Sequence, residues 1–210
     1  GLLPPAEFIP LAEENGLIEK LDRWVLRKAI RQVAQWRRDG SGPSRVNVNV
    51  TARHHSSAEA QQNVLELLEE HDLPGEALTL ETTERVAFRH AHPFETLRQH
   101  GVQLSIDDFG TGYSALFYLH RYDADAMKID RGFIREFDTD TQTDILVRAM
   151  LDIADHLGMA SIAEGVETEA QLQRLHELEC PYAQGYLFAR PMPADAFEAY
   201  MEQQSPLPSA

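Results

Sequence analysis

The stretch Gln103-Leu104-Ser105-Ile106-Asp107-Asp108 decides the fold, because a short apolar run leads directly into two carboxylates. The same pattern recurs along the chain, where strand-like runs end on acidic or amide side chains and helix-like segments follow. Other runs of this kind end on or contain Asn49, Glu81, Lys128, Glu164 and Gln184. Alternating strands and helices predict a parallel sheet with its chemical groups at the carboxyl ends of the strands.

Six strands are expected from these runs. They cover Arg45–Val50, Leu78–Thr82, Gln103–Asp107, Ala126–Asp130, Ala160–Glu164 and Ala183–Phe188. An open doubly wound sheet would bind its ligand at the one point where the strand order reverses. Acids at nearly all strand ends are easier to explain if those ends form a closed ring. We therefore predict the α/β class and a closed (β/α) barrel. Such a barrel needs about eight strands, so we expect its first strand or strands to precede Gly1.

Helical spacing and capping residues predict the intervening helices. Leu146, Met150, Ile153 and Leu157 form one apolar stripe of a long helix. Two pairs have the spacing of a capping box, and a short helix is expected near Tyr113–Arg121. The pairs are Ser56 with Glu59, and Thr168 with Gln171. We expect one domain over residues 1–204, followed by a disordered tail over residues 205–210.

The chain is strongly acidic. Its 210 residues include 19 Lys and Arg against 34 Asp and Glu, a formal charge of −15. This charge argues against general nucleic-acid binding, although bound cations would let an acidic site take a nucleotide. The single cysteine, Cys180, excludes an intrachain disulfide. Because no membrane span or signal peptide is visible, we expect a cytoplasmic domain, which is compatible with a membrane-anchored parent protein.

Hard oxygen ligands dominate the expected strand ends. Asn49, Glu81, Asp107, Asp108 and Glu164 suit Mg²⁺ or Mn²⁺. Two such ions about 3.5–4 Å apart would clamp the attacking and leaving oxygens of a phosphodiester. Any one acid alone is more often a solvated strand end or a helix cap, but their recurrence at one topological place favours a site. For Lys128, an internal salt bridge and a phosphate- or water-orienting role are equally supported.

Several segments in order resemble a known family. The segment Asp107-Asp108-Phe109-Gly110-Thr111-Gly112-Tyr113-Ser114 resembles the signature of the EAL domain, the cyclic di-GMP phosphodiesterase of bacteria. The resemblance continues through Lys128–Arg131, Ala163–Thr168 and Gln184–Phe188, and upstream through Pro5–Glu13, Val48–Arg53 and Glu81–Glu84. It spans nearly the whole chain and is highly specific.

This resemblance implies a modified TIM-type (β/α)₈ barrel that hydrolyses cyclic di-GMP to linear pGpG with two ions of Mg²⁺ or Mn²⁺. The implied metal ligands are Asn49, Glu81 and Asp107 for one ion, with Asp107 bridging to a second ion held by Asp108 and Glu164. The implied catalytic residues are Lys128, which would contact the attacking water, and Glu164. By the same resemblance, Glu84 and Glu167 would brace the loop after Asp108, and Gln184 would lie against the substrate.

The family's Glu-Ala-Leu tripeptide, on its first strand, would lie upstream of Gly1. The tripeptide Glu76-Ala77-Leu78 is a decoy, because it follows a Pro-Gly turn and leads into the Glu81 strand. There are two alternatives. The first is a degenerate module that binds cyclic di-GMP or a protein without hydrolysis, against which the complete ligand set argues. The second is another Mg²⁺-dependent barrel of the enolase kind, against which the loop after Asp108 argues. Implied partners are cyclic di-GMP, a second copy in a homodimer, and a fused GGDEF or sensory domain.

We predict that residues 1–210 alone have little or no activity, because the first-strand Glu and a nearby Arg would be missing and strand edges would stay unpaired. Adding the native upstream sequence, on the order of 30 residues, should restore cooperative unfolding and hydrolysis. Parallel assays of both forms with Mn²⁺ and cyclic di-GMP provide the test. Full activity from residues 1–210 would show that the first-strand Glu is dispensable or replaced.

Overall fold

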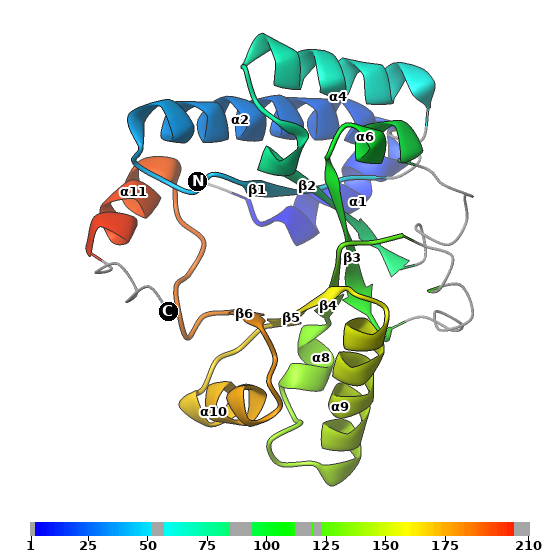
Figure 1. The fold of residues 1–210 in the computed structure, drawn as a ribbon, viewed down its shortest axis with the longest axis vertical. Coiled ribbons are helices and arrows are strands. Elements are labelled where there is room, and N and C mark those ends of the chain that lie inside the picture. The colour runs from blue at the N-terminus through cyan, green and yellow to red at the C-terminus, as the bar shows by residue number, and fades with distance from the viewer. Residues whose placement is uncertain (1–2, 52–56, 85–93, 112–118, 120–122, 204–210) are drawn as a thin grey trace. The chain divides into compact units, whose positions relative to one another are not determined.

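The computed structural model describes residues 3–51, 57–84, 94–111, 119 and 123–203 (Figure 1). Strands β1 to β6 occur in the sheet in the order in which they occur in the chain. The described residues fall into two compact units, and strand β2 (Leu78–Thr83) contributes three residues to each. Most of the short helix expected near Tyr113–Arg121, and the tail over residues 205–210, lie outside the described residues.

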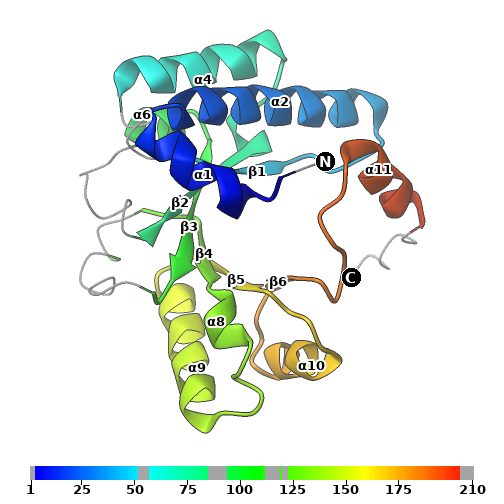
Figure 2. The ribbon, with the colours of Figure 1, turned by 180° about the vertical axis from the view of Figure 1, so that it is seen from behind.

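The first unit consists mainly of helices, and its longest helix packs against the first strand. Its elements are α1 (Pro5–Glu14), α2 (Ile18–Asp39), β1 (Val46–Asn49), α4 (Ala58–Glu70), η1 (Gly75–Ala77), α6 (Glu95–Gln99) and α11 (Ala194–Gln203). Helices α2 and α4 lie side by side in both views (Figures 1 and 2). Trp36 of α2 donates a hydrogen bond to Glu198 at 2.6 Å, and its ring packs at a tilt against the ring of Phe197, so α11 is held on α2.

The second unit holds strands β3 to β6 of the sheet. Its elements are β3 (Gln103–Phe109), β4 (Ala126–Ile129), α8 (Arg131–Ile134), α9 (Thr141–His156), β5 (Ala160–Glu164), α10 (Glu169–Glu177) and β6 (Tyr182–Gln184). Strands β3 to β6 pair in parallel, each with the next. The core side chains Ile106, Met127 and Ile129 are buried completely. All six predicted strands are present, although the last ends at Gln184, before a turn closed by Phe188 N–H on Gly185 O.

Two local predictions need correction. The buried residues of α9 are Val147, Met150, Leu151 and Ala154. Leu146 and Leu157 lie at the edge of this face and are 48% and 40% exposed, because the side of α9 that contacts β4 and β5 is turned from the predicted stripe. The cap of α4 is Ser57, whose extended backbone lets its Oγ accept from Ala60 N. Ser56 lies outside the described residues.

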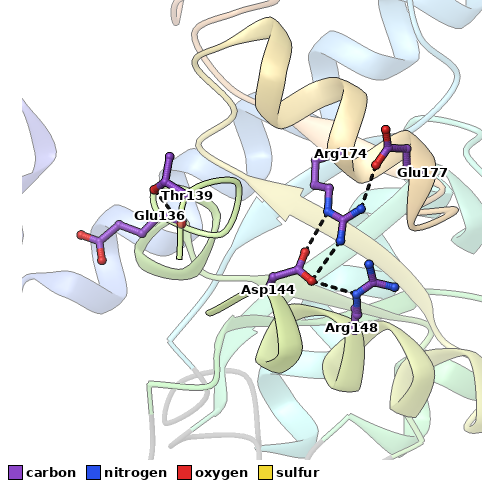
Figure 3. Close-up of polar contacts among 6 residues, drawn as sticks. All are labelled: Glu136, Thr139, Asp144, Arg148, Arg174 and Glu177. Carbon is purple, nitrogen blue, oxygen red and sulfur yellow. Dashed lines mark hydrogen bonds and ion pairs between the residues drawn. The ribbon is translucent and has the colours of Figure 1, made fainter. Parts of the chain in front are cut away.

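An ion network joins α9 to α10 within the second unit (Figure 3). Arg174 Nε and Nη2 donate to the two oxygens of Asp144 at 2.8 and 3.0 Å. Arg148 Nε donates to the same carboxylate at 2.9 Å, and Arg174 Nη1 reaches Glu177 at 2.8 Å. The two-point contact between Arg174 and Asp144 is the geometry in which such pairs are strongest. None of the described helices is long and apolar enough to cross a membrane.

Asp144→Asn should make stability less dependent on pH in the acid range. Hydrogen bonds from Arg174, then Arg148, lower the pKa of Asp144 below its ordinary value of 3.8. A carboxyl with a lowered folded-state pKa stabilises the fold fully above that ordinary value and loses its contribution as pH falls through the folded-state pKa. Urea midpoints measured from pH 7 to pH 2.5 should therefore converge for wild type and variant at the acid end. A constant difference across this range would contradict the assignment.

Candidate active site

The ammonium group of Lys128, on β4, lies among three carboxylates of the second unit. Its Nζ is 2.8 Å from Glu81 Oε2, 2.6 Å from Glu164 Oε1 and 3.2 Å from Asp107 Oδ1. The Lys128 side chain is only 5% exposed. These acids come from the strands β2, β5 and β3, so the strand-end groups do converge.

Asp130, which directly follows β4, has a different contact. It is the N-cap of α8, where its Oδ1 accepts a hydrogen bond from Gly132 N at 2.8 Å. The internal salt bridge considered for Lys128 is therefore present, and its partners are the acids Glu81, Asp107 and Glu164 on the other strands. A salt bridge to those acids and a role in chemistry are compatible, because the same acids are the candidate metal ligands.

An irregularity in β3 brings two adjacent carboxylates to the cluster. Ile106 pairs with Met127 and Phe109 pairs with Ile129, so Asp107 and Asp108 together lie opposite the single residue Lys128. Two residues against one define a β-bulge. At this bulge Asp108 has a φ of 53°, in the left-handed region where Asp is one of the few tolerated side chains. A regular strand would point the two carboxylates to opposite faces.

Asp107, Asp108 and Glu164 form a cluster that fits a divalent cation. Each offers an oxygen within 4.8 Å of the oxygens of the others. Burial, followed by repulsion from Asp107, raises the pKa of Asp108 above its ordinary value. Burial also raises the pKa of Glu164, and Lys128 only partly offsets it. A bound cation would relieve the cost of these charges, and carboxylate oxygens are the ligands that Mg²⁺ and Mn²⁺ prefer.

Lys128 remains protonated in this environment. Burial alone would lower the pKa of its ammonium group, but Glu81, Glu164 and Asp107 outweigh burial and raise the pKa above its ordinary value. In the metal-free protein, a protonated Lys128 therefore lies among the acids. It can donate hydrogen bonds, but it cannot act as a base there.

The loop after β5 is held tightly to β6. Val166 N donates to Gln184 O at 3.0 Å, and Gln184 Nε2 donates to Glu164 Oε1 at 2.6 Å. Gly185 has no room for a side chain, because a Cβ there would lie 2.1 Å from Val166 O. Gly165 has a φ of 72° and would place a Cβ 2.6 Å from Arg131 Cβ. Glycine is needed at both positions, a requirement that the sequence alone did not reveal.

The remaining predicted residues have distinct places. Glu84 is buried and its Oε2 accepts from Gly110 N at 3.1 Å, a contact with the loop after Asp108. The backbone N–H of Glu167 donates to Gln171. Asn49 ends β1 and belongs to the first unit. The decoy Glu76 also belongs to the first unit, where its carboxylate lies beside Gly101.

Comparison of this chain with known proteins identifies the family to which it belongs. The EAL domain model matches residues 1–191. The chain is 43% identical over 199 residues to the bifunctional diguanylate cyclase/cyclic di-GMP phosphodiesterase MucR of Pseudomonas aeruginosa, covering 93% of this chain and 29% of that protein. It is 42% identical over 205 residues to the cyclic di-GMP phosphodiesterase NbdA of the same organism, covering 96% and 26%. The chain thus spans under a third of the length of these curated relatives.

Solved structures agree with this result. The PaMucR phosphodiesterase in complex with c-di-GMP superposes with a TM-score of 0.87 at 43% identity, covering 94% of this chain and 81% of that one. The Mycobacterium smegmatis DcpA EAL domain superposes with a TM-score of 0.82 at 34% identity, covering 87% and 84%. The predicted α/β fold of the TIM-barrel type is thereby confirmed for this chain.

Lys128→Met should destabilise the metal-free protein by about 3 kcal/mol, because it leaves three carboxylates without their shared cation. Mn²⁺ should restore much of that stability by binding the same acids in the folded state only. Chemical denaturation with and without Mn²⁺ measures both effects. Unchanged stability of the metal-free variant would contradict the importance of Lys128 for charge compensation.

Proposed function

This chain belongs to the EAL domain family, and on that premise we propose that it hydrolyses cyclic di-GMP to linear pGpG with two divalent cations. The observation that carries the proposal is the Lys128 ammonium beside the carboxylates of Asp107, Asp108 and Glu164. A phosphodiester needs positive charge near its oxygens and a group that accepts a proton from water. This cluster offers both.

The cation ligands we propose are Asp107, Asp108, Glu164 and Glu81, all in the second unit. Asn49 is proposed as a further ligand on the family resemblance alone. The ions, Mg²⁺ or Mn²⁺, would supply Lewis-acid polarisation of the phosphate and a water of lowered pKa.

The protein's own groups divide the work. Lys128, whose ammonium group contacts Glu81, Asp107 and Glu164, would donate a hydrogen bond to the attacking water or a phosphate oxygen and so orient it. Glu164, whose pKa is raised by burial, would accept the proton that the water loses as its oxygen bonds to phosphorus and the ester bond breaks. Gln184, which donates to Glu164 at 2.6 Å, would hold that carboxylate and lie against the substrate. Glu84 and Glu167 would brace the loop after Asp108.

The alternative is a degenerate module that binds cyclic di-GMP or a protein without hydrolysis. The intact set of Asp107, Asp108, Lys128 and Glu164 favours the enzyme, because a binding module has no need for a half-buried cluster of mutually repelling carboxylates.

We also propose a cytoplasmic setting within a longer protein. The relatives are several times longer than this chain and include one named as a bifunctional cyclase/phosphodiesterase and another, from Escherichia coli, named as the oxygen sensor DosP. A fused GGDEF or sensory domain, and a homodimer, are the partners that we expect besides cyclic di-GMP.

Hydrolysis should depend on divalent cations and on Asp107. In the protein with its native upstream sequence, Mn²⁺ or Mg²⁺ should support conversion of cyclic di-GMP to pGpG. Ca²⁺ should inhibit, because its bonds are longer and its geometry looser. Asp107→Asn should lower kcat by several orders of magnitude while leaving the circular dichroism spectrum unchanged. Product chromatography over a time course measures each rate.

Glu76→Ala is the matched control. It removes a carboxylate of the decoy tripeptide, which belongs to the first unit and is not one of the proposed cation ligands, and should leave kcat nearly unchanged. Turnover that survives exhaustive chelation would exclude the two-metal reaction. A folded Asp107→Asn variant with near-wild-type kcat would show that the ligand assignment is wrong.

A further inference from the structure

The buried side chain of Gln171, on α10, connects two segments that carry site residues. Its Oε1 accepts hydrogen bonds from Glu167 N at 2.8 Å and Thr168 N at 3.1 Å. Its Nε2 donates to Arg135 O at 3.4 Å. The residue is 5% exposed, and its three hydrogen bonds are partly buried. The capping box predicted for Thr168 and Gln171 is present, but a cap accounts for only part of these contacts.

Each end of this connection lies close in sequence to the site. Glu167 and Thr168 end the loop that begins at Glu164, whose carboxylate contacts Lys128 at 2.6 Å. Arg135 is the C-cap of α8, the helix that follows β4 and therefore Lys128. The amide of Gln171 thus connects the segment that follows Glu164 with the segment that follows Lys128.

The loop needs such an anchor, because Gly165 directly follows Glu164. Glycine permits many backbone conformations, so Gly165 does not by itself fix the path of the loop relative to Glu164, whose carboxylate contacts Lys128 and Gln184. The bond from Val166 to Gln184 holds one point of the loop, and Gln171 holds the next two residues.

We infer that Gln171 is a positioning residue, which holds the loop after Glu164 and thereby keeps the Glu164 carboxylate against Lys128. This inference rests on the proposed function in one respect only, namely the effect on turnover. The effect on the loop itself follows from the hydrogen bonds and can be measured without substrate.

The chain offers a matched control on the same helix. Arg174 also attaches α10 to a neighbouring helix, through Asp144 of α9, but its described contacts include no backbone atom of the loop. Arg174→Met should weaken the helix packing without freeing the loop. Gln171→Met should do both. Gln171→Glu keeps the acceptor for Glu167 and Thr168, as capping boxes with Glu do, and replaces the donor to Arg135 O with a carboxylate oxygen that repels this carbonyl.

The three variants are compared in the protein with its native upstream sequence. Amide hydrogen exchange at Glu167 and Thr168 reports whether the loop is held, and kcat and KM for cyclic di-GMP with Mn²⁺ report the chemistry. Gln171→Met should accelerate exchange at both amides and lower kcat about tenfold. This is the low end of the effects seen when a residue that supports a metal-binding side chain is replaced. KM should change less than about twofold, because the Gln171 side chain does not meet the substrate.

Gln171→Glu should restore both slow exchange and kcat, while Arg174→Met should lower the urea midpoint and leave both unchanged. Faster exchange in Gln171→Met with wild-type kcat would overturn the positioning role, as would an equal loss of kcat in Arg174→Met. Unchanged exchange in Gln171→Met would overturn the anchoring itself. If the wild-type protein fails to cleave cyclic di-GMP, the proposed function fails. Hydrogen exchange at Glu167 and Thr168 in the wild type and in Gln171→Met still tests the anchoring of the loop, because it needs no substrate.

Discussion

The contact of the Lys128 ammonium with Glu81, Asp107 and Glu164 is the interaction on which the arrangement of the site depends. Three carboxylates on separate strands repel one another, and the energy of that repulsion rises as water is excluded. One buried cation at 2.6–3.2 Å from each lets the strand ends come together before any metal binds. Lys128 therefore has a part in folding as well as its proposed part in hydrolysis, and a variant at this position changes both.

Much of the second unit could be predicted from the residues. The strands that carry Glu81, Asp107, Lys128 and Glu164 lie where short apolar runs predict them, and their carboxyl ends bring these four side chains together. This works because apolar strands between helices have few alternative arrangements, and parallel pairing places their ends at one edge. The family resemblance added the roles, which neither spacing nor composition can assign.

Other features depend on tertiary contacts that no local pattern contains. Helix α9 has apolar residues on two neighbouring stripes, and only packing against β4 and β5 selects the one with Val147 and Met150. Gly165 and Gly185 were visible as glycines, but the atoms that exclude a side chain there, Arg131 Cβ and Val166 O, come from other segments. Gln171 was visible as a cap, whereas its contact with Arg135 O spans 36 positions and leaves no signal in the sequence.

The bulge at Asp107 and Asp108 makes the length of β3 a chemical constraint. Ile106 and Phe109 are three positions apart, yet both are buried and pair with residues of β4 that are only two positions apart, Met127 and Ile129. Deleting one residue between them would restore regular alternation and leave a single side chain opposite Lys128. A graft or chimera of this domain should therefore be joined outside residues 106–109. Within that span, residue count matters as much as residue type.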